Sequence, residues 1–126
     1  MQAVILAGGL GTRLLPVTQT IPKAMIPIRG RPFLEYQLAL LKSHGVTDII
    51  LSIGHLGEVL ASHFGDGSSL GLSIRYGRED ERLLGTGGAL KNVEHFLNDV
   101  FFVTYGDGYL TVDYQRAMAF FRRPVA

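Results

Sequence analysis

The chain has 126 residues, of which 47% are hydrophobic and 18% are charged, so it is long enough for one domain with a buried core. Its formal charge of +1 is far from the strongly basic composition of a nucleic-acid-binding protein. It contains no cysteine, which excludes disulfides, thiolate metal sites and cysteine nucleophiles. We find no signal-peptide pattern and no run of about 18 apolar residues that could span a membrane, and we expect a cytoplasmic protein.

Short apolar runs alternate with longer segments of helical period, as in a parallel sheet with crossover helices. The apolar runs predict strands at residues 2–6, 48–53, 72–76 and 100–105. The helical segments predict helices at residues 32–44, 57–64, 89–96 and 113–121. Pro32 suits a first helical turn, and Gly45 suits the end of that helix.

This order of elements predicts an α/β fold, a Rossmann-like three-layer αβα domain over residues 1–126. We expect a mainly parallel sheet with the strands in the order 3-2-1-4. The direction of winding then reverses between the first and fourth strands, which opens a crevice at their carboxyl ends. The loop after the first strand and the corner at residues 106–108 face each other there, where open α/β sheets bind their ligands.

A glycine-rich loop follows the first strand. It reads Leu6, Ala7, Gly8, Gly9, Leu10, Gly11, Thr12, Arg13 and Leu14. Such glycines let backbone amides bind phosphate oxygens, and Arg13 adds a permanent charge suited to phosphate. A plain strand-to-helix turn would also explain the glycines. A dinucleotide fingerprint is disfavoured by Leu14 and by the missing acidic residue after the second strand, and no Walker A motif occurs.

A segment marked by prolines 16, 22 and 27 carries Lys23. Prolines lower the entropy cost of ordering a long loop, so they can hold one side chain in place. A lone lysine is usually a solvated surface residue. The position of Lys23 between Pro22 and an apolar stretch nevertheless favours a positioned charge.

Together these segments resemble the signature of the sugar-phosphate nucleotidylyltransferases, also called nucleoside-diphosphate-sugar pyrophosphorylases. The resemblance rests on residues 8–14, Pro16, Thr18, Pro22-Lys23, residues 30–36, residues 85–90 and Gly106-Asp107. It covers essentially the whole chain as the N-terminal part of a nucleotidyltransferase domain. The version at residues 84–90 is most similar to the heptose-1-phosphate guanylyltransferases, with N-acetylmuramate-1-phosphate uridylyltransferases as near neighbours.

The resemblance implies an enzyme of sugar-nucleotide biosynthesis, which supplies precursors of cell-surface polysaccharides. Such an enzyme transfers a nucleoside monophosphate from a nucleoside triphosphate to a sugar 1-phosphate and releases pyrophosphate. Arg13 and Lys23 would neutralise phosphate charge and Asp107 would bind Mg²⁺, which makes these three residues the expected catalytic group. The expected nucleotide contacts are Leu6, Ala7, Gly8, Gly9, Gly11, Thr12, Arg13, Lys23, Gly85, Thr86, Gly87 and Gly88, the last four at the base. Those four residues also fit the first turn of a helix, and both roles can hold together.

Asp107 has an internal control, because the same tripeptide occurs at Gly65-Asp66-Gly67. Asp66 follows a helix and is expected in an exposed structural turn, whereas Asp107 ends an apolar strand. The four histidines, at positions 44, 55, 63 and 95, lack metal-ligand spacing and are expected at the surface or at helix ends. Residues 78–82 are expected to form a solvated loop, with closure over the nucleotide as the alternative.

We expect the sugar-phosphate oxygen to attack the α-phosphorus in line, with positioning and charge neutralisation in place of a side-chain nucleophile. In the family, the portion beyond this chain carries most of the sugar site and a second metal-binding aspartate. A non-catalytic nucleotide-binding module or inactive fragment is one alternative, and a nicotinamide-dependent reductase is another. The exposed edge of such a half sheet would favour homo-oligomers.

Overall fold

The computed structural model describes residues 1–8, 22–54, 56–78, 85–106 and 108–124. Its centre is a sheet in which every neighbouring pair of strands is parallel. The four strands are β1 (Gln2–Ala7), β4 (Asp48–Ile53), β5 (Ser73–Arg78) and β6 (Phe102–Tyr105). Their order is β5-β4-β1-β6, which is the predicted 3-2-1-4 order, so the predicted fold class is confirmed.

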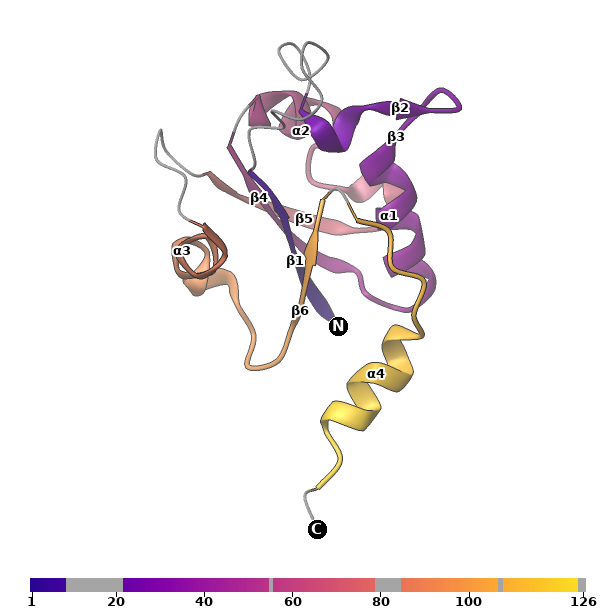
Figure 1. Ribbon diagram of the computed structural model, residues 1–126, viewed down its shortest axis with the longest axis vertical. Helices are drawn as coiled ribbons and strands as arrows, with labels where there is room; N and C mark the ends of the chain where they lie inside the picture. The colour runs from indigo at the N-terminus through magenta and orange to yellow at the C-terminus, as the bar shows by residue number, and fades with distance from the viewer. Residues whose placement is uncertain (9–21, 55, 79–84, 107, 125–126) are drawn as a thin grey trace.

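Helices cover both faces of this sheet (Figure 1). They are α1 (Phe33–Ser43), α2 (Gly57–Phe64), α3 (Gly85–Asn92) and α4 (Tyr114–Phe121). Within the described ranges, short 3₁₀ turns are found at η3 (Lys23–Met25), η4 (Ser68–Leu70) and η5 (Glu94–Phe96). The larger core lies under α1 and α2, and α3 with η5 covers the opposite face.

Alternate residues of β1 supply the two cores. Ala3 and Ile5 belong to the larger core, and Val4 belongs to the smaller one with Ile50 and Val93. All five side chains are fully buried. A strand that is buried on both faces needs apolar residues throughout, which is why β1 and β4 appear in the sequence as continuous apolar runs.

The end of α1 follows the sequence prediction. Gly45 has φ +79°, and its N–H donates to the Lys42 carbonyl at 2.9 Å. The Val46 N–H reaches back to the Leu41 carbonyl at 2.9 Å, which completes a Schellman motif. A glycine at this position adopts the left-handed conformation without a steric penalty, so the predicted stop at Gly45 is confirmed.

The prediction of one helix over residues 89–96 is wrong. Helix α3 begins at Gly85 and ends at Asn92, and η5 follows as a separate turn. Val93, with φ −108°, lies between them because its buried side chain packs against Gly77 of β5. The bounds of three strands also differ from the prediction: 2–6 becomes Gln2–Ala7, 72–76 becomes Ser73–Arg78 and 100–105 becomes Phe102–Tyr105.

A small antiparallel hairpin before α1 was not predicted from the sequence. It pairs β2 (Pro27–Ile28) with β3 (Arg31–Pro32). Arg29 and Gly30, between the strands, both have positive φ, +52° and +79°, as a tight two-residue hairpin turn requires. Strands of two residues are too short to produce a periodic pattern.

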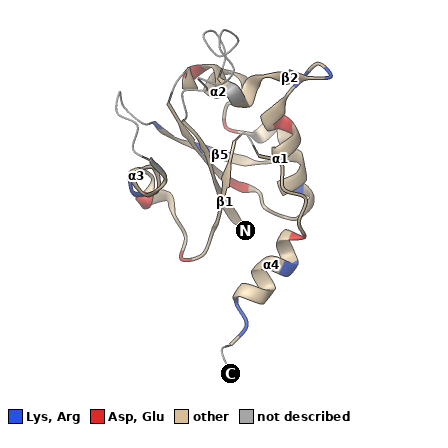
Figure 2. Ribbon diagram, in the orientation of Figure 1, with Lys and Arg blue, Asp and Glu red and all other residues tan. Residues whose placement is uncertain are grey.

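Residues of opposite charge are interspersed over the helices and strand ends (Figure 2). Several form ion pairs, including Arg75 with Asp48 at 2.9 Å and Lys91 with Glu94 at 2.6 Å. Over the described ranges, no helix has the length and apolarity needed to cross a bilayer.

Candidate functional site

The carboxyl ends of three strands meet around the end of β1. Leu6 is in register with Ser52 of β4 on one side and with Tyr105 of β6 on the other. The winding of the chain reverses between β1 and β6, so this is the crevice position predicted from the sequence. The structure brings the end of β1 and the residues before Asp107 together: the Gly106 N–H donates to the Leu6 carbonyl at 2.9 Å.

Two glycines allow this close approach. A Cβ on Gly54, just after β4, would lie 3.0 Å from the Gly8 carbonyl oxygen. A Cβ on Gly106 would lie 3.1 Å from the Cβ of Ala7. Gly106 was part of the predicted corner, but sequence reasoning gave Gly54 no role in the site. The available signal was its position, because Gly54 follows an apolar run predicted as a strand, just as Gly106 does.

The predicted phosphate loop is described only at its start. Leu6 and Ala7 are half-buried, and Gly8 is buried at the end of β1. The remaining predicted contacts of this loop, Gly9, Gly11, Thr12 and Arg13, lie outside the described residues. Their contact with phosphate therefore stays a prediction.

Lys23 belongs to the short turn η3, which is fixed to the protein core. The Met25 N–H donates to the Pro22 carbonyl at 2.9 Å, and Ala24 is only 3% exposed. The next residue, Ile26, accepts a hydrogen bond from the Phe33 N–H of α1 at 3.0 Å. The backbone of the Lys23 turn is thus anchored to α1, while the side chain of Lys23 lies outside the described part.

The predicted base-contacting residues form the first turn of α3. Gly87 is exposed, and a Cβ placed on it would meet nothing within 4 Å. The hydroxyl oxygens of Thr86 and Tyr105 lie 3.3 Å apart, which links this turn to the end of β6. Tyr105 is 56% exposed and was not predicted as a site residue, although it directly precedes the Gly106-Asp107 motif. The glycine turn therefore lies beside the crevice with open space in front of Gly87.

Asp107, the predicted metal ligand, lies outside the described residues. Its neighbours are placed: the Gly108 N–H donates to the Tyr105 carbonyl at 3.0 Å, which closes a turn directly after β6. Within the described ranges, no three His, Asp or Glu side chains are close enough together to form a metal site. Metal binding at Asp107, which the family resemblance implies, therefore stays a prediction.

The internal control behaves as predicted, because Asp66 lies in an exposed turn. Its Oδ1 accepts a hydrogen bond from the Ser68 N–H at 3.0 Å, and this bond lowers the pKa of the Asp66 carboxyl below its ordinary value. Of the histidines, His44 caps α1, and His63 and His95 are exposed, as predicted; His55 is not among the described residues.

Arg78 is the one described member of the predicted solvated loop, since residues 79–82 fall outside the described ranges. It ends β5 and donates from Nε to Glu58 Oε1 of α2 at 2.7 Å. This hydrogen bond lowers the pKa of the exposed Glu58 carboxyl. Arg78 is therefore an exposed, ion-paired residue.

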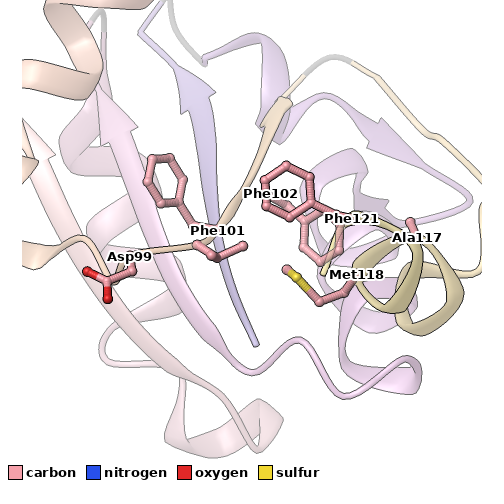
Figure 3. A pocket seen from close by; sticks show the side chains of 7 residues that line it. Asp99, Phe101, Phe102, Ala117, Met118 and Phe121 are labelled. Atoms are coloured by element: carbon pink, nitrogen blue, oxygen red, sulfur yellow. The ribbon is translucent and has the colours of Figure 1, made fainter. Parts of the chain in front are cut away.

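A separate hollow of about 420 Å³ lies at the opposite, amino end of β6. Phe102 of β6 and Met118 and Phe121 of α4 lie around it (Figure 3). Its lining is mainly apolar, with Asp99 as the one charged residue. A phosphorylated ligand needs several convergent hydrogen-bond donors, which this hollow does not offer. The carboxyl edge of the sheet, around the end of β1, is the better candidate site.

Comparison with known proteins gives a consistent result. A family model described as nucleotidyl transferase matches residues 2–126. A D-glycero-α-D-manno-heptose 1-phosphate guanylyltransferase of Campylobacter jejuni is 43% identical over 90% of this chain and 50% of its own length. A UTP–glucose-1-phosphate uridylyltransferase of Synechocystis is 39% identical over 97% of this chain and 34% of its own length.

The solved structures include HddC from Yersinia pseudotuberculosis in complex with GMP-PN. It superposes with a TM-score of 0.82 at 37% identity and covers 94% of this chain and 52% of the HddC chain. The present chain thus spans about half the length of HddC and of the Campylobacter protein. The chain belongs to the nucleotidyl transferase family, in which the relatives named here are sugar-phosphate nucleotidyltransferases.

Proposed function

We propose that this chain is the nucleotide-binding part of a sugar-1-phosphate nucleotidylyltransferase. The reaction transfers a nucleoside monophosphate from a nucleoside triphosphate to a sugar 1-phosphate, giving a nucleoside-diphosphate sugar and pyrophosphate. The main support is the crowding of Gly8, Gly54 and Gly106 where β1, β4 and β6 end. Glycines at these three positions carry no side chain, so a ligand can approach the backbone closely at this edge of the sheet.

The proposed mechanism needs no side-chain nucleophile. A phosphate oxygen of the sugar 1-phosphate is already ionised near neutral pH and attacks the α-phosphorus, with pyrophosphate as the leaving group. Arg13 and Lys23 supply positive charge to the triphosphate, so the protein acts through positioning and electrostatic stabilisation. Mg²⁺ bound at Asp107 would add further positive charge. Use of nucleoside triphosphates agrees with the cytoplasmic location expected from the sequence.

The relatives favour a guanine nucleotide. Two heptose-1-phosphate guanylyltransferases are 43% and 46% identical to this chain, although other relatives use UTP or dTTP according to their names. We therefore expect GTP to give the largest thermal shift among GTP, UTP, CTP and dTTP with Mg²⁺. If the chain binds a triphosphate but releases no pyrophosphate with any sugar 1-phosphate tested, the alternative of a non-catalytic nucleotide-binding module would be supported instead.

Arg13→Ala should remove the thermal shift that a triphosphate produces. A hydrogen bond to a charged group contributes about 1.5–3 kcal/mol, so the loss of an arginine from the phosphates weakens binding about tenfold to a hundredfold. Differential scanning fluorimetry with GTP and Mg²⁺ measures this shift. Arg116→Ala, on the exposed face of α4, is the matched control and should keep it. An unchanged shift in Arg13→Ala would remove Arg13 from the site.

Gly87→Ala should separate stability from binding. The added Cβ meets nothing within 4 Å, and alanine favours a helix over glycine by up to about 1 kcal/mol, so the unfolding midpoint should not fall. The same Cβ would occupy the open space proposed for the base, and we expect GTP affinity to fall at least about tenfold, or 1.4 kcal/mol. Isothermal titration calorimetry checks this, with exposed Lys91→Ala on the same helix as control. Wild-type affinity in Gly87→Ala would place the base elsewhere.

A further inference from the structure

Gln37 is a polar residue buried in the middle of α1, outside every motif of the sequence. It is only 2% exposed. Its Nε2 donates to Thr104 Oγ1 at 3.0 Å and to the Tyr105 carbonyl oxygen at 3.2 Å. Both acceptors belong to the last two residues of β6, so Gln37 ties α1 to the carboxyl end of that strand.

The Tyr105 carbonyl determines which way the amide of Gln37 points. A carbonyl oxygen only accepts hydrogen bonds, so the group that faces it is the NH₂. Oε1 of Gln37 is then buried, and no described group is its hydrogen-bond partner. Buried polar atoms nearly always have a partner, so this exception calls for an explanation. The contacts that hold Gln37 in place are those to β6.

The carbonyl that binds Gln37 also closes the turn that carries Asp107. It accepts a second hydrogen bond from the Gly108 N–H at 3.0 Å. On the other side, the Gly106 N–H is bonded to Leu6 of β1 at 2.9 Å. The turn is therefore anchored twice, to β1 through its backbone and to α1 through the side chain of Gln37.

We propose that Gln37 is a positioning residue, whose buried amide fixes the turn at residues 105–108 relative to the end of β1. This inference rests on the proposed function, in which that turn carries the Mg²⁺ ligand Asp107. Gln37 touches no ligand and acts through the Tyr105 carbonyl. Loss of the Gln37 amide should therefore weaken Mg²⁺-dependent triphosphate binding while the fold remains stable.

Gln37→Met tests this role, because methionine is similar in size and has no N–H donor. With Mg²⁺ we expect the Kd for GTP to rise at least about tenfold, since small displacements of a positioning group have large effects. With EDTA in place of Mg²⁺ the Kd should change by less than about twofold. The unfolding midpoint should stay within about 4 °C, because the substitution also removes the unpartnered Oε1.

A second measurement follows the turn without any ligand. Hydrogen exchange of the Gly108 amide, measured by NMR, should become faster in Gln37→Met because its acceptor carbonyl loses one anchor. Gln115→Met is the matched control: Gln115 Nε2 donates to the His44 carbonyl at 3.2 Å, at the far end of α1. It should leave both GTP affinity and Gly108 exchange unchanged. The variant Asp107→Asn gives the reference value for a complete loss of the effect of Mg²⁺ on GTP affinity.

The outcomes separate the two proposals. If the wild-type chain binds no triphosphate, the proposed function fails, and the role of Gln37 in binding fails with it. If the wild-type chain binds GTP with Mg²⁺ and Gln37→Met binds equally well, only the role of Gln37 is overturned. A fall of more than about 10 °C in the midpoint, with equal losses of binding in Mg²⁺ and EDTA, would make Gln37 a purely structural residue.

Discussion

Replacing Gly77 by alanine should lower the free energy of unfolding by about 3 kcal/mol, the upper range for overpacking a core. Gly77 lies in β5, and a Cβ built on it would be 2.0 Å from Cγ1 of Val93. Val93 is fully buried and β-branched, so it has few alternative rotamers. It cannot withdraw easily, because neighbouring Asn92 is bonded to the Arg78 carbonyl at 3.1 Å. Urea unfolding of both proteins measures the difference.

A double-mutant cycle shows whether this clash is the cause. Val93→Ala removes the atom that the new Cβ would meet, at the cost of a cavity when it is present alone. The double variant Gly77→Ala/Val93→Ala should therefore be more stable than the sum of the two single changes predicts, by about 1 kcal/mol or more. Either of two results would contradict the clash: strict additivity of the two changes, or a loss of stability below about 0.5 kcal/mol for Gly77→Ala alone. Each would show that Val93 can move away from the added methyl group.

Gln2→Met should cost about 3 kcal/mol of stability, because the buried amide of Gln2 makes three hydrogen bonds that methionine cannot make. Gln2 is 1% exposed, and its Nε2 donates to the Phe96 carbonyl at 2.9 Å and to Asp48 Oδ2 at 3.1 Å. Its Oε1 accepts a hydrogen bond from the Asn98 N–H at 2.8 Å. Both ends of this amide are satisfied, so the variant loses all three hydrogen bonds.

Thermal and urea unfolding of Gln2→Met provide the measurement, with exposed Gln115→Met as the reference for a glutamine-to-methionine change. The reference should stay within about 0.5 kcal/mol of the wild type. Gln37→Met should also be much less destabilised than Gln2→Met, because Gln37 has an unpartnered Oε1 and Gln2 does not. If Gln37→Met and Gln2→Met lost equal amounts of stability, the unpartnered Oε1 of Gln37 would not account for the expected difference.

The sequence predicted the architecture well because the strongest signals are local. Apolar runs such as residues 48–53 and the stop at Gly45 fix the strands and the end of α1, and right-handed crossovers then leave one strand order. The helix itself was predicted to begin at residue 89, but the other role given for residues 85–88, the first turn of a helix, agrees with the start of α3 at Gly85. The strands on either side of Arg29 and Gly30 were too short to give a periodic pattern in the sequence.

The candidate site was predicted in outline, from motifs that come together at the crevice. Contacts between distant elements were not predicted, because they depend on packing. Gln37 shows this best: it occupies a position of the apolar stripe formed by Leu34, Leu38 and Leu41, and this break in the pattern was the available signal. Gly54 was given no role in the predicted site. For Arg13, Lys23 and Asp107, the side-chain roles stay predictions.

Helix α1 bears none of the predicted catalytic residues, yet it connects to two segments that do. Its first N–H is bonded to Ile26 beside the Lys23 turn, and Gln37 one turn later is bonded to the end of β6. Through these two contacts, α1 sets the spacing between the lysine segment and the aspartate segment.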